Sequence, residues 1–187
     1  MKQQHLMQKL RAVSLLAALI LLSPLSYGDS LDVTKANFKT VGEGNYSYWF
    51  WDLYHARLLS ADGSFVNYQQ SAPLQLELTY ARDITKKEFI DATMDQWKIQ
   101  QGAILKVHKI WAGELNTLWR DVKKGDKLTA VLRLDGVVEF YFNGESLGNT
   151  TDPAFGRTFF DIWLSEKTTA PELRKQLLAL NAKAENN

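Results

Sequence analysis

The residues of this sequence that could do chemistry are few, and their spacing does not point to a reaction. We expect neither a nucleophile elbow nor a phosphate-binding glycine loop. His55 and His108 are the only histidines beyond residue 28, and the chain has no cysteine. A transition-metal site needs three or four ligands, and the spacing of these residues offers none, so we predict no metal and no cofactor. We expect His108 to lie at the surface or rim of a helix.

Tyr46 and Tyr54 are better suited to binding than to reaction. They lie in an aromatic-rich stretch, and their hydroxyls could donate hydrogen bonds to a carboxylate or a phenol. The alternative is that both rings fill the core with their hydroxyls at its rim. The six tryptophans allow the same two interpretations, because small-molecule sites are mostly apolar with a few orienting polar groups.

Asp52 is a carboxylate within the same aromatic stretch. A lone buried charge is costly, so this group must be solvated, paired or neutral. We expect an ion pair with an arginine, for which the candidates are Arg57, Arg82 and Arg133. The alternative is a proton-transfer group with a raised pKa.

The N-terminus has the pattern of an export signal. Basic residues at 2, 9 and 11 precede a mainly apolar run over 12–22, which is shorter than the ~20 residues of a membrane span. Small residues at 26 and 28 then match the spacing that signal peptidase recognises. We predict a signal peptide over residues 1–28, cleavage near Gly28-Asp29, a periplasmic or secreted mature protein and no stable membrane anchor.

The remaining chain fits one nearly neutral domain. Removal of residues 1–28 takes away three of the 22 basic residues and none of the 21 acidic ones, leaving a net charge of −2. This balance does not favour nucleic-acid binding. We predict a single domain over 29–187 with its core at about 38–180, stabilised by packing because cysteine is absent.

Hydrophobic patterns predict strands followed by helices, twice over. The first strand signals begin at Phe38. The stretch 46–54 is rich in aromatic residues, and both faces near Trp49 to Tyr54 are expected to be covered. Residues 74–80 alternate as a half-buried strand, and helical patterns follow from Thr85 and through 104–118.

The second half repeats this order. A hairpin turns at Asp135-Gly136, Asn143-Gly144 signals another turn, and helices follow Asp152-Pro153 and Pro171. The order predicts an α+β fold with an antiparallel sheet and helices on one face.

Several segments in this order resemble the exported bacterial branch of the chalcone isomerase-like proteins. They comprise Gly42-Glu43-Gly44 with the strand that ends at Leu53-Tyr54, Leu78-Thr79-Tyr80-Ala81-Arg82-Asp83-Ile84, Asp121 to Asp126, Phe140 to Gly144, Asp152-Pro153-x-Phe155 and Phe159-Phe160-x-Ile162-Trp163-Leu164. The resemblance spans about Phe38 to Leu178. It implies a large curved antiparallel sheet packed against a layer of helices, as an open-faced sandwich with a cleft between the layers.

The same resemblance argues against the plant enzymes' ring-closing reaction. Those enzymes carry an arginine on the first long strand, whereas residues 45–48 here read Asn-Tyr-Ser-Tyr. Tyr54 falls where they carry a threonine and where the related fatty-acid binders carry a tyrosine. The tyrosine and asparagine that the plant enzymes carry on the next helix fall near Phe89 and Asp95 here. A later threonine or serine of those enzymes corresponds to Gly156.

Three hypotheses of function follow. The first is a non-catalytic periplasmic protein that binds a fatty acid or another small apolar ligand in the cleft. The second is an isomerase on a chalcone-like substrate, with stabilisation of an enolate by Tyr46, Tyr54 or Arg57. The third is an interaction scaffold without a ligand. Ligand identity and oligomeric state are not predicted. The candidate ligand-binding residues are Tyr54, Tyr46, Trp51, Arg57, Phe89 and Trp97.

Overall fold

The computed structural model describes residues 37–48 and 51–180, so the predicted signal peptide over 1–28 lies outside the described residues. The described part forms one antiparallel sheet with the strand order β1-β2-β3-β4-β5-β6, and each strand pairs with the next one in sequence. The strands are β1 (Lys39–Tyr48), β2 (Trp51–Ser60), β3 (Leu74–Tyr80), β4 (Lys127–Leu132), β5 (Val138–Phe142) and β6 (Glu145–Asn149).

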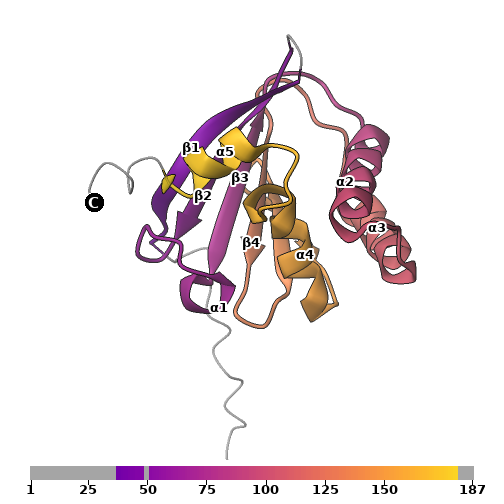
Figure 1. Ribbon diagram of the computed structural model, residues 1–187. Helices are drawn as coiled ribbons and strands as arrows, with labels where there is room; N and C mark the ends of the chain where they lie inside the picture. The colour runs from indigo at the N-terminus through magenta and orange to yellow at the C-terminus, as the bar shows by residue number, and fades with distance from the viewer. Residues whose placement is uncertain (1–36, 49–50, 181–187) are drawn as a thin grey trace, which may run out of the picture. The chain divides into compact units, whose positions relative to one another are not determined.

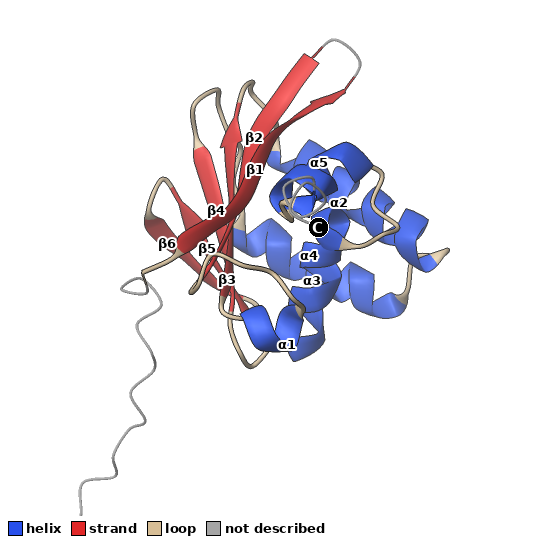
Figure 2. Cartoon of the chain, turned by 60° about the vertical axis from the view of Figure 1, so that its left-hand side comes forward, coloured by secondary structure: helices blue, strands red, loops and turns tan. Residues whose placement is uncertain are grey.

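The helices cover one face of this sheet, as the sequence predicts (Figure 2). Within the described residues they are α1 (Tyr68–Ser71), α2 (Lys86–Gln101), α3 (Lys106–Leu118), α4 (Pro153–Leu164) and α5 (Pro171–Leu177). The α+β fold is therefore confirmed. None of the helices in the described part has the length and apolar character needed to cross a membrane.

Strand alternation decides which side chains face the helices. On β3, Leu74, Leu76 and Leu78 are buried against the helical layer, whereas Gln75 and Glu77 point to the opposite, helix-free face. On β5 the alternation continues, with Val138 and Phe140 buried. On β4 all residues from Leu128 to Leu132 are buried, but only Leu128, Ala130 and Leu132 belong to the main hydrophobic core, which lies on the helical side of the sheet.

Two predicted helix starts are confirmed by their caps. The backbone N–H of Thr85 donates to a Glu88 carboxylate oxygen over 2.8 Å, and the backbone N–H of Glu88 donates to the Thr85 hydroxyl over 3.3 Å. At α4, the Asp152 carboxylate accepts from the backbone N–H of Ala154 and also from the indole Nε1 of Trp111, at 2.9 and 3.0 Å. The second contact ties the start of α4 to α3.

The turn between β4 and β5 is one residue longer than the expected two-residue turn. Arg133 N–H donates to the Val137 carbonyl, and Gly136 N–H donates to the Arg133 carbonyl, with Gly136 at φ 86°. This is a three-residue loop that ends in a left-handed residue. The turn at Asn143-Gly144 has φ values of 49° and 89°, as a two-residue hairpin turn requires.

The aromatic stretch 46–54 was expected as a strand with both faces covered near Trp49 to Tyr54. Its described residues, 46–48 and 51–54, belong to the ends of β1 and β2 at the tip of their hairpin. Tyr48 pairs with Trp51, so the chain reverses between them, and both side chains are exposed. β3 ends at Tyr80, opposite Tyr54, which leaves the tip without a neighbouring β3 residue. Figure 1 shows this hairpin rising past the rest of the sheet. The expected coverage was wrong because β3 ends opposite Tyr54, so Trp51 and Asp52 lie beyond it and are exposed.

Two glycines let α5 lie directly on β1. A Cβ on Gly42 would overlap the backbone carbonyl oxygen of Gln176, and one on Gly44 would overlap the Gln176 side chain. This close approach explains why positions 42 and 44 need glycine, which has no side chain.

Candidate functional site

Tyr54 on β2 is held at the interface between the sheet and α4. Its hydroxyl oxygen accepts a hydrogen bond of 2.9 Å from Trp163 Nε1, and its ring stacks on Tyr46 with centroids 5.2 Å apart. Burial raises the pKa of Tyr54 well above its usual value, although the Trp163 hydrogen bond opposes the shift. Burial also raises the pKa of Tyr46, and nearby Tyr48 adds to that shift. Both hydroxyls therefore stay protonated at neutral pH, which suits them to donate hydrogen bonds.

Tyr54 belongs to a closed circuit of six aromatic side chains, named the aromatic cluster below. Successive ring centroids lie 6.1, 5.5, 4.3, 6.0 and 5.3 Å apart along the series Tyr54, Tyr80, Phe89, Trp119, Phe159 and Trp163. The hydrogen bond between Trp163 and Tyr54 closes the circuit. Strand β2 supplies Tyr54 and β3 supplies Tyr80. The others come from the helical layer: Phe89 from α2, Phe159 and Trp163 from α4, and Trp119 directly after α3. The cluster thus occupies the sheet–helix interface where the resemblance implies a cleft.

The aromatic cluster has a partly accessible rim and a buried floor. Tyr54 and Phe89 are half-buried, as is the neighbouring Tyr46. Tyr80 and Trp119 are buried on either side of Phe89. A molecule that enters this interface must therefore pass the rim residues before it reaches the floor.

Two hydrogen-bond donors on the floor have no partner among the described residues. They are the Tyr80 hydroxyl and Trp119 Nε1, and Trp97 Nε1 outside the cluster is a third such group. Buried polar groups in native proteins are nearly always paired, so an unpaired donor calls for an explanation. An unsatisfied buried donor costs about 1–3 kcal/mol. The cluster therefore offers hydrogen bonds that the protein itself does not use.

Trp97 does not join Tyr54 at one site. It packs in a separate part of the core against His108, Trp111 and Phe155, with centroids 5.2, 5.6 and 6.1 Å away. His108, expected at the surface, is only 1% exposed, and its Nδ1 accepts the backbone N–H of Leu105 over 3.2 Å. The expectation was wrong because α3 turns this residue toward α2. Desolvation lowers the pKa of His108, so the imidazole stays neutral.

Arg57 faces the opposite side of the sheet from Tyr54. Its guanidinium donates to one Glu77 oxygen from Nε at 3.1 Å and from Nη2 at 2.6 Å. Lys127 Nζ and Gln75 Nε2 bond the other oxygen at 3.3 and 3.0 Å. This charge network on the helix-free face separates Arg57 from Tyr46 and Tyr54, so these three side chains cannot meet one substrate group.

Asp52 does not form the expected ion pair with an arginine. Its Oδ1 accepts a 2.6 Å hydrogen bond from the Ser47 hydroxyl at the exposed hairpin tip. Arg133 pairs instead with Asp135 and Glu139. The expectation was wrong because Asp52 lies on the part of β2 that extends past the end of β3, where it is exposed to water.

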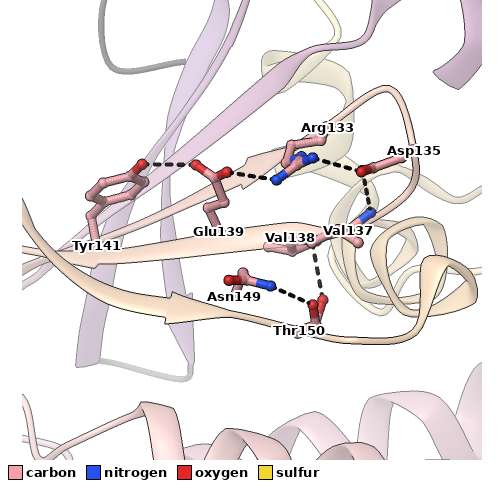
Figure 3. Close-up of polar contacts among 8 residues, drawn as sticks. All are labelled: Arg133, Asp135, Val137, Val138, Glu139, Tyr141, Asn149 and Thr150. Atoms are coloured by element: carbon pink, nitrogen blue, oxygen red, sulfur yellow. Dashed lines mark hydrogen bonds and ion pairs between the residues drawn. The ribbon is translucent and has the colours of Figure 1, made fainter. Parts of the chain in front are cut away.

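Two surface depressions are described, and neither is lined by a residue of the aromatic cluster. The larger one, of about 400 Å³, lies on the helix-free face and includes Arg57, Lys127 and Tyr141 in its lining. Figure 3 shows the Tyr141 hydroxyl bonded to Glu139, which in turn bonds Arg133. The smaller one, of about 180 Å³, lies beside α1 and the start of α4. Across the described ranges, no group of three His, Cys, Asp or Glu side chains is placed to hold a metal ion.

Contrary to the expectation that no nucleophile elbow is present, the segment Gly144-Glu145-Ser146-Leu147-Gly148 has the letters of one. In the structure this segment is the turn and strand β6, and Ser146 is exposed opposite Tyr141. A nucleophile elbow requires a sharp turn from a strand into a helix. Ser146 therefore lacks the setting that activates such a serine.

The position expected to correspond to a hydroxyl residue of the plant enzymes has no room for any side chain. A Cβ on Gly156 would overlap the carbonyl oxygen of Gly136 and the side chain of Leu132. Phe89 brings an apolar ring to the cluster, whereas Asp95 is exposed on α2. Close packing of α4 on the β4–β5 turn thus replaces a polar group at this point.

Comparison with known proteins agrees with this arrangement. A family model described as chalcone isomerase-like matches residues 23–179. The chain belongs to the chalcone isomerase-like family. The structure is also similar to the crystal structure of a fatty-acid binding protein of Arabidopsis thaliana, with a TM-score of 0.56 and 11% sequence identity. The match covers 80% of this chain and 91% of that one, which supports a common fold. No curated protein matches the sequence at a significant level.

Sequence reasoning did not select four members of the aromatic cluster: Tyr80, Trp119, Phe159 and Trp163. Tyr80 ends an alternating strand, and Trp119 directly follows a helical pattern. Phe159 and Trp163 fall in a helical pattern that equally describes an ordinary core. Trp51, selected as a ligand contact, is instead exposed at the hairpin tip. Only the packing of α2, α3 and α4 on β2 and β3 brings the cluster together.

Proposed function

We propose that this protein binds a fatty acid or another small apolar molecule with an oxygen acceptor at the aromatic cluster, without catalysis. The observation that carries the proposal is the pair of unpartnered donors on the floor, Tyr80 Oη and Trp119 Nε1. An acceptor oxygen on the ligand would satisfy a donor of this pair, and the surrounding rings suit an apolar chain. The fatty-acid binding relative supports the same ligand class. The predicted signal peptide supports a periplasmic or secreted site of action.

The aromatic cluster suits a ligand whose acceptor oxygen carries no full negative charge. Cation–aromatic contacts in the described ranges are made by Arg82, Arg120 and Arg157, and none involves a member of the cluster. A buried carboxylate without a cation is costly. A protonated acid or an ester carbonyl can accept the same hydrogen bonds at much lower cost.

The electrostatic properties of Arg57, Tyr54 and Tyr80 argue against an isomerase. Stabilisation of an enolate relies on positive charges or preorganised hydrogen-bond donors aimed at the oxygen where negative charge develops. Arg57 lies on the other face, and burial raises the pKa of both Tyr54 and Tyr80. These tyrosines are therefore weaker acids than free tyrosine. We propose binding in place of ring closure on this ground.

Native mass spectrometry of the purified protein with an added long-chain fatty acid tests the proposal. The decisive variant is Tyr80→Phe, which removes only the hydroxyl and should weaken binding about threefold to tenfold. Tyr141→Phe is the matched control, because it removes a hydroxyl from the lining of the helix-free depression. Equal loss in both variants, or loss only in Tyr141→Phe, would move the ligand away from the cluster. No retained ligand with the wild-type protein would refute binding.

A further inference from the structure

The larger depression, on the helix-free face of the sheet, is separate from the aromatic cluster. Its volume is about 400 Å³, within the size range of small-molecule pockets. Strands β2, β3, β4 and β5 all contribute to its lining, and no member of the aromatic cluster does. Figure 2 shows the helices on the other side of this sheet. Packing between sheet and helices therefore does not account for the side chains that line the depression.

The floor of the depression is apolar. Leu59 on β2 and Val131 on β4 both belong to the lining, and both pair with Gln75 on the strand between them. Because directly paired residues share a face, they point to the helix-free side as Gln75 does. They are nevertheless only 6% and 3% exposed. Phe38, just before β1, adds a half-buried aromatic side chain to the lining. The depression can therefore bury the apolar part of a small ligand.

Two cations in the lining have more hydrogen-bond donors than the protein uses. One carboxylate oxygen of Glu77 accepts both of its bonds from Arg57. The other oxygen accepts one bond from Lys127 and one from Gln75, so the carboxylate is fully engaged. A guanidinium has five N–H donors and an ammonium has three. Within the described part of the chain, Arg57 Nη1 bonds no side chain and Lys127 Nζ bonds only Glu77, so donors of both cations remain available.

The lining carries one net positive charge, because it contains these two cations and a single carboxylate. Two further acids point to the same face but lie outside the lining, and each has a partner of its own. Glu139 on β5 pairs with Arg133 over 3.2 Å. Glu43 on β1 lies 3.7 Å from His55 Nε2. Neither acid bonds the two cations of the lining, so their spare donors face the depression.

The geometry points to a binding site for a small organic carboxylate in this depression. The ligand carboxylate accepts the spare donors of Arg57 and Lys127, and its apolar part covers Leu59 and Val131. Charge-assisted hydrogen bonds of this kind are stronger than neutral ones. The aromatic cluster, by contrast, has no cation in contact and suits an uncharged acceptor. The two sites therefore select ligands of different charge, and the carboxylate site does not rest on the proposed function.

Titration with benzoate, followed by ¹H–¹⁵N NMR spectroscopy, tests the site. We expect the backbone signals of Gln75, Lys127 and Thr129 to move, because all three residues line the depression. The indole signal of Trp119 reports on the aromatic cluster and should stay in place. Benzamide has the same shape without the charge and should bind at least about fivefold more weakly. Inorganic phosphate should also bind more weakly than benzoate, because it cannot use the apolar floor.

Three variants separate the charge of the site from the charge of the whole protein. Lys127→Gln should weaken benzoate binding about fivefold. Lys98→Gln is the matched control, because it removes the same charge from an exposed position on α2, and it should bind as the wild type does. Glu77→Gln removes the carboxylate that competes for both cations, so it should strengthen binding by about twofold to fivefold.

Several outcomes would overturn the inference. Signals of the depression that stay in place with benzoate would exclude the site, and movement of the Trp119 indole signal alone would place benzoate in the aromatic cluster. Equal binding of benzamide, or an equal loss in Lys98→Gln, would exclude recognition by the cations of the lining. Phosphate that binds as tightly as benzoate would exclude a role of the apolar floor. Weaker binding to Glu77→Gln would mean that this carboxylate does not compete with the ligand.

The carboxylate site and the proposed function fail separately. Tyr80→Phe should bind benzoate as tightly as the wild type, because Tyr80 does not line the depression. Benzoate binding without fatty-acid binding at the aromatic cluster would refute the proposed function and leave the carboxylate site standing. Fatty-acid binding at the cluster without benzoate binding would do the reverse.

Discussion

Removing one hydroxyl from the aromatic cluster should make the ligand-free protein more stable. The Tyr80 hydroxyl is buried without a partner, so Tyr80→Phe removes an unsatisfied donor and keeps the ring that contacts Tyr54 and Phe89. An unsatisfied buried group costs about 1–3 kcal/mol, and the small gap left by the oxygen offsets part of the gain. We expect the free energy of unfolding to rise by about 1–2 kcal/mol. For a chain of this length the corresponding rise in Tm is about 2–6 °C.

The same chemical change at Tyr54 should have the opposite sign. Its hydroxyl accepts the Trp163 Nε1 hydrogen bond, so Tyr54→Phe leaves that indole donor unpaired and should cost about 1–2 kcal/mol. Urea denaturation of both variants and the wild type, without ligand and with equal m-values, measures the difference directly. If Tyr80→Phe is destabilised, the hydroxyl of Tyr80 is satisfied in solution and the argument for a ligand acceptor fails. If Tyr54→Phe is stabilised as well, the hydrogen bond from Trp163 is not formed in solution.

Three further predictions follow from other parts of the structure. Gly156→Ala should lower the free energy of unfolding by about 1–3 kcal/mol, because its Cβ would overlap Gly136. Gly113→Ala, in the open middle of α3, should raise it by about 0.5–1 kcal/mol. Chemical denaturation measures both changes, and changes of the same sign would contradict the packing. Burial lowers the pKa of His108, so the unfolded chain takes up a proton at higher pH than the folded one, and stability should fall as pH drops below about 6.5. His108→Leu should flatten this dependence between pH 7.5 and 5.5, and an unchanged slope would assign it to other groups. In competition mass spectrometry at pH 8, a fatty-acid methyl ester should bind at least as tightly as the free acid, because the cluster lacks a cation; an acid that binds more than about tenfold more tightly would require one.

Local patterns predicted much of the architecture. The alternation over 74–80 marked β3 and its buried face, and the Thr85–Glu88 pair marked the start of α2. These signals depend on residues within one turn or one strand, so they can be read without knowing what packs against them. The two glycines of the Gly42-Glu43-Gly44 segment were visible as well, although their reason, the close approach of α5, was not.

Other features depended on contacts that no local pattern encodes. The aromatic stretch 46–54 lacks the glycine or asparagine that usually marks a turn, so the reversal between Tyr48 and Trp51 had no local signal. His108 looked like a rim residue because helical periodicity alone does not say which helix lies opposite. Arg57 and Tyr54 are close in sequence but an odd number of positions apart on β2, so their side chains point to opposite faces of the sheet. Because helices cover only one face, the two side chains have different surroundings.

By itself the sequence determined the fold class and the types of residue available for binding: many aromatic side chains, tyrosine hydroxyls and no arginine over residues 39–48. The tertiary structure decided which of them come into contact. It places Tyr54 in one cluster with Tyr80, Trp119 and Trp163. Arg57 lies on the other face of the sheet. The physical reason is that strand and helix periodicity are local, whereas the pairing or isolation of a buried hydroxyl depends on side chains contributed by elements far apart in the chain.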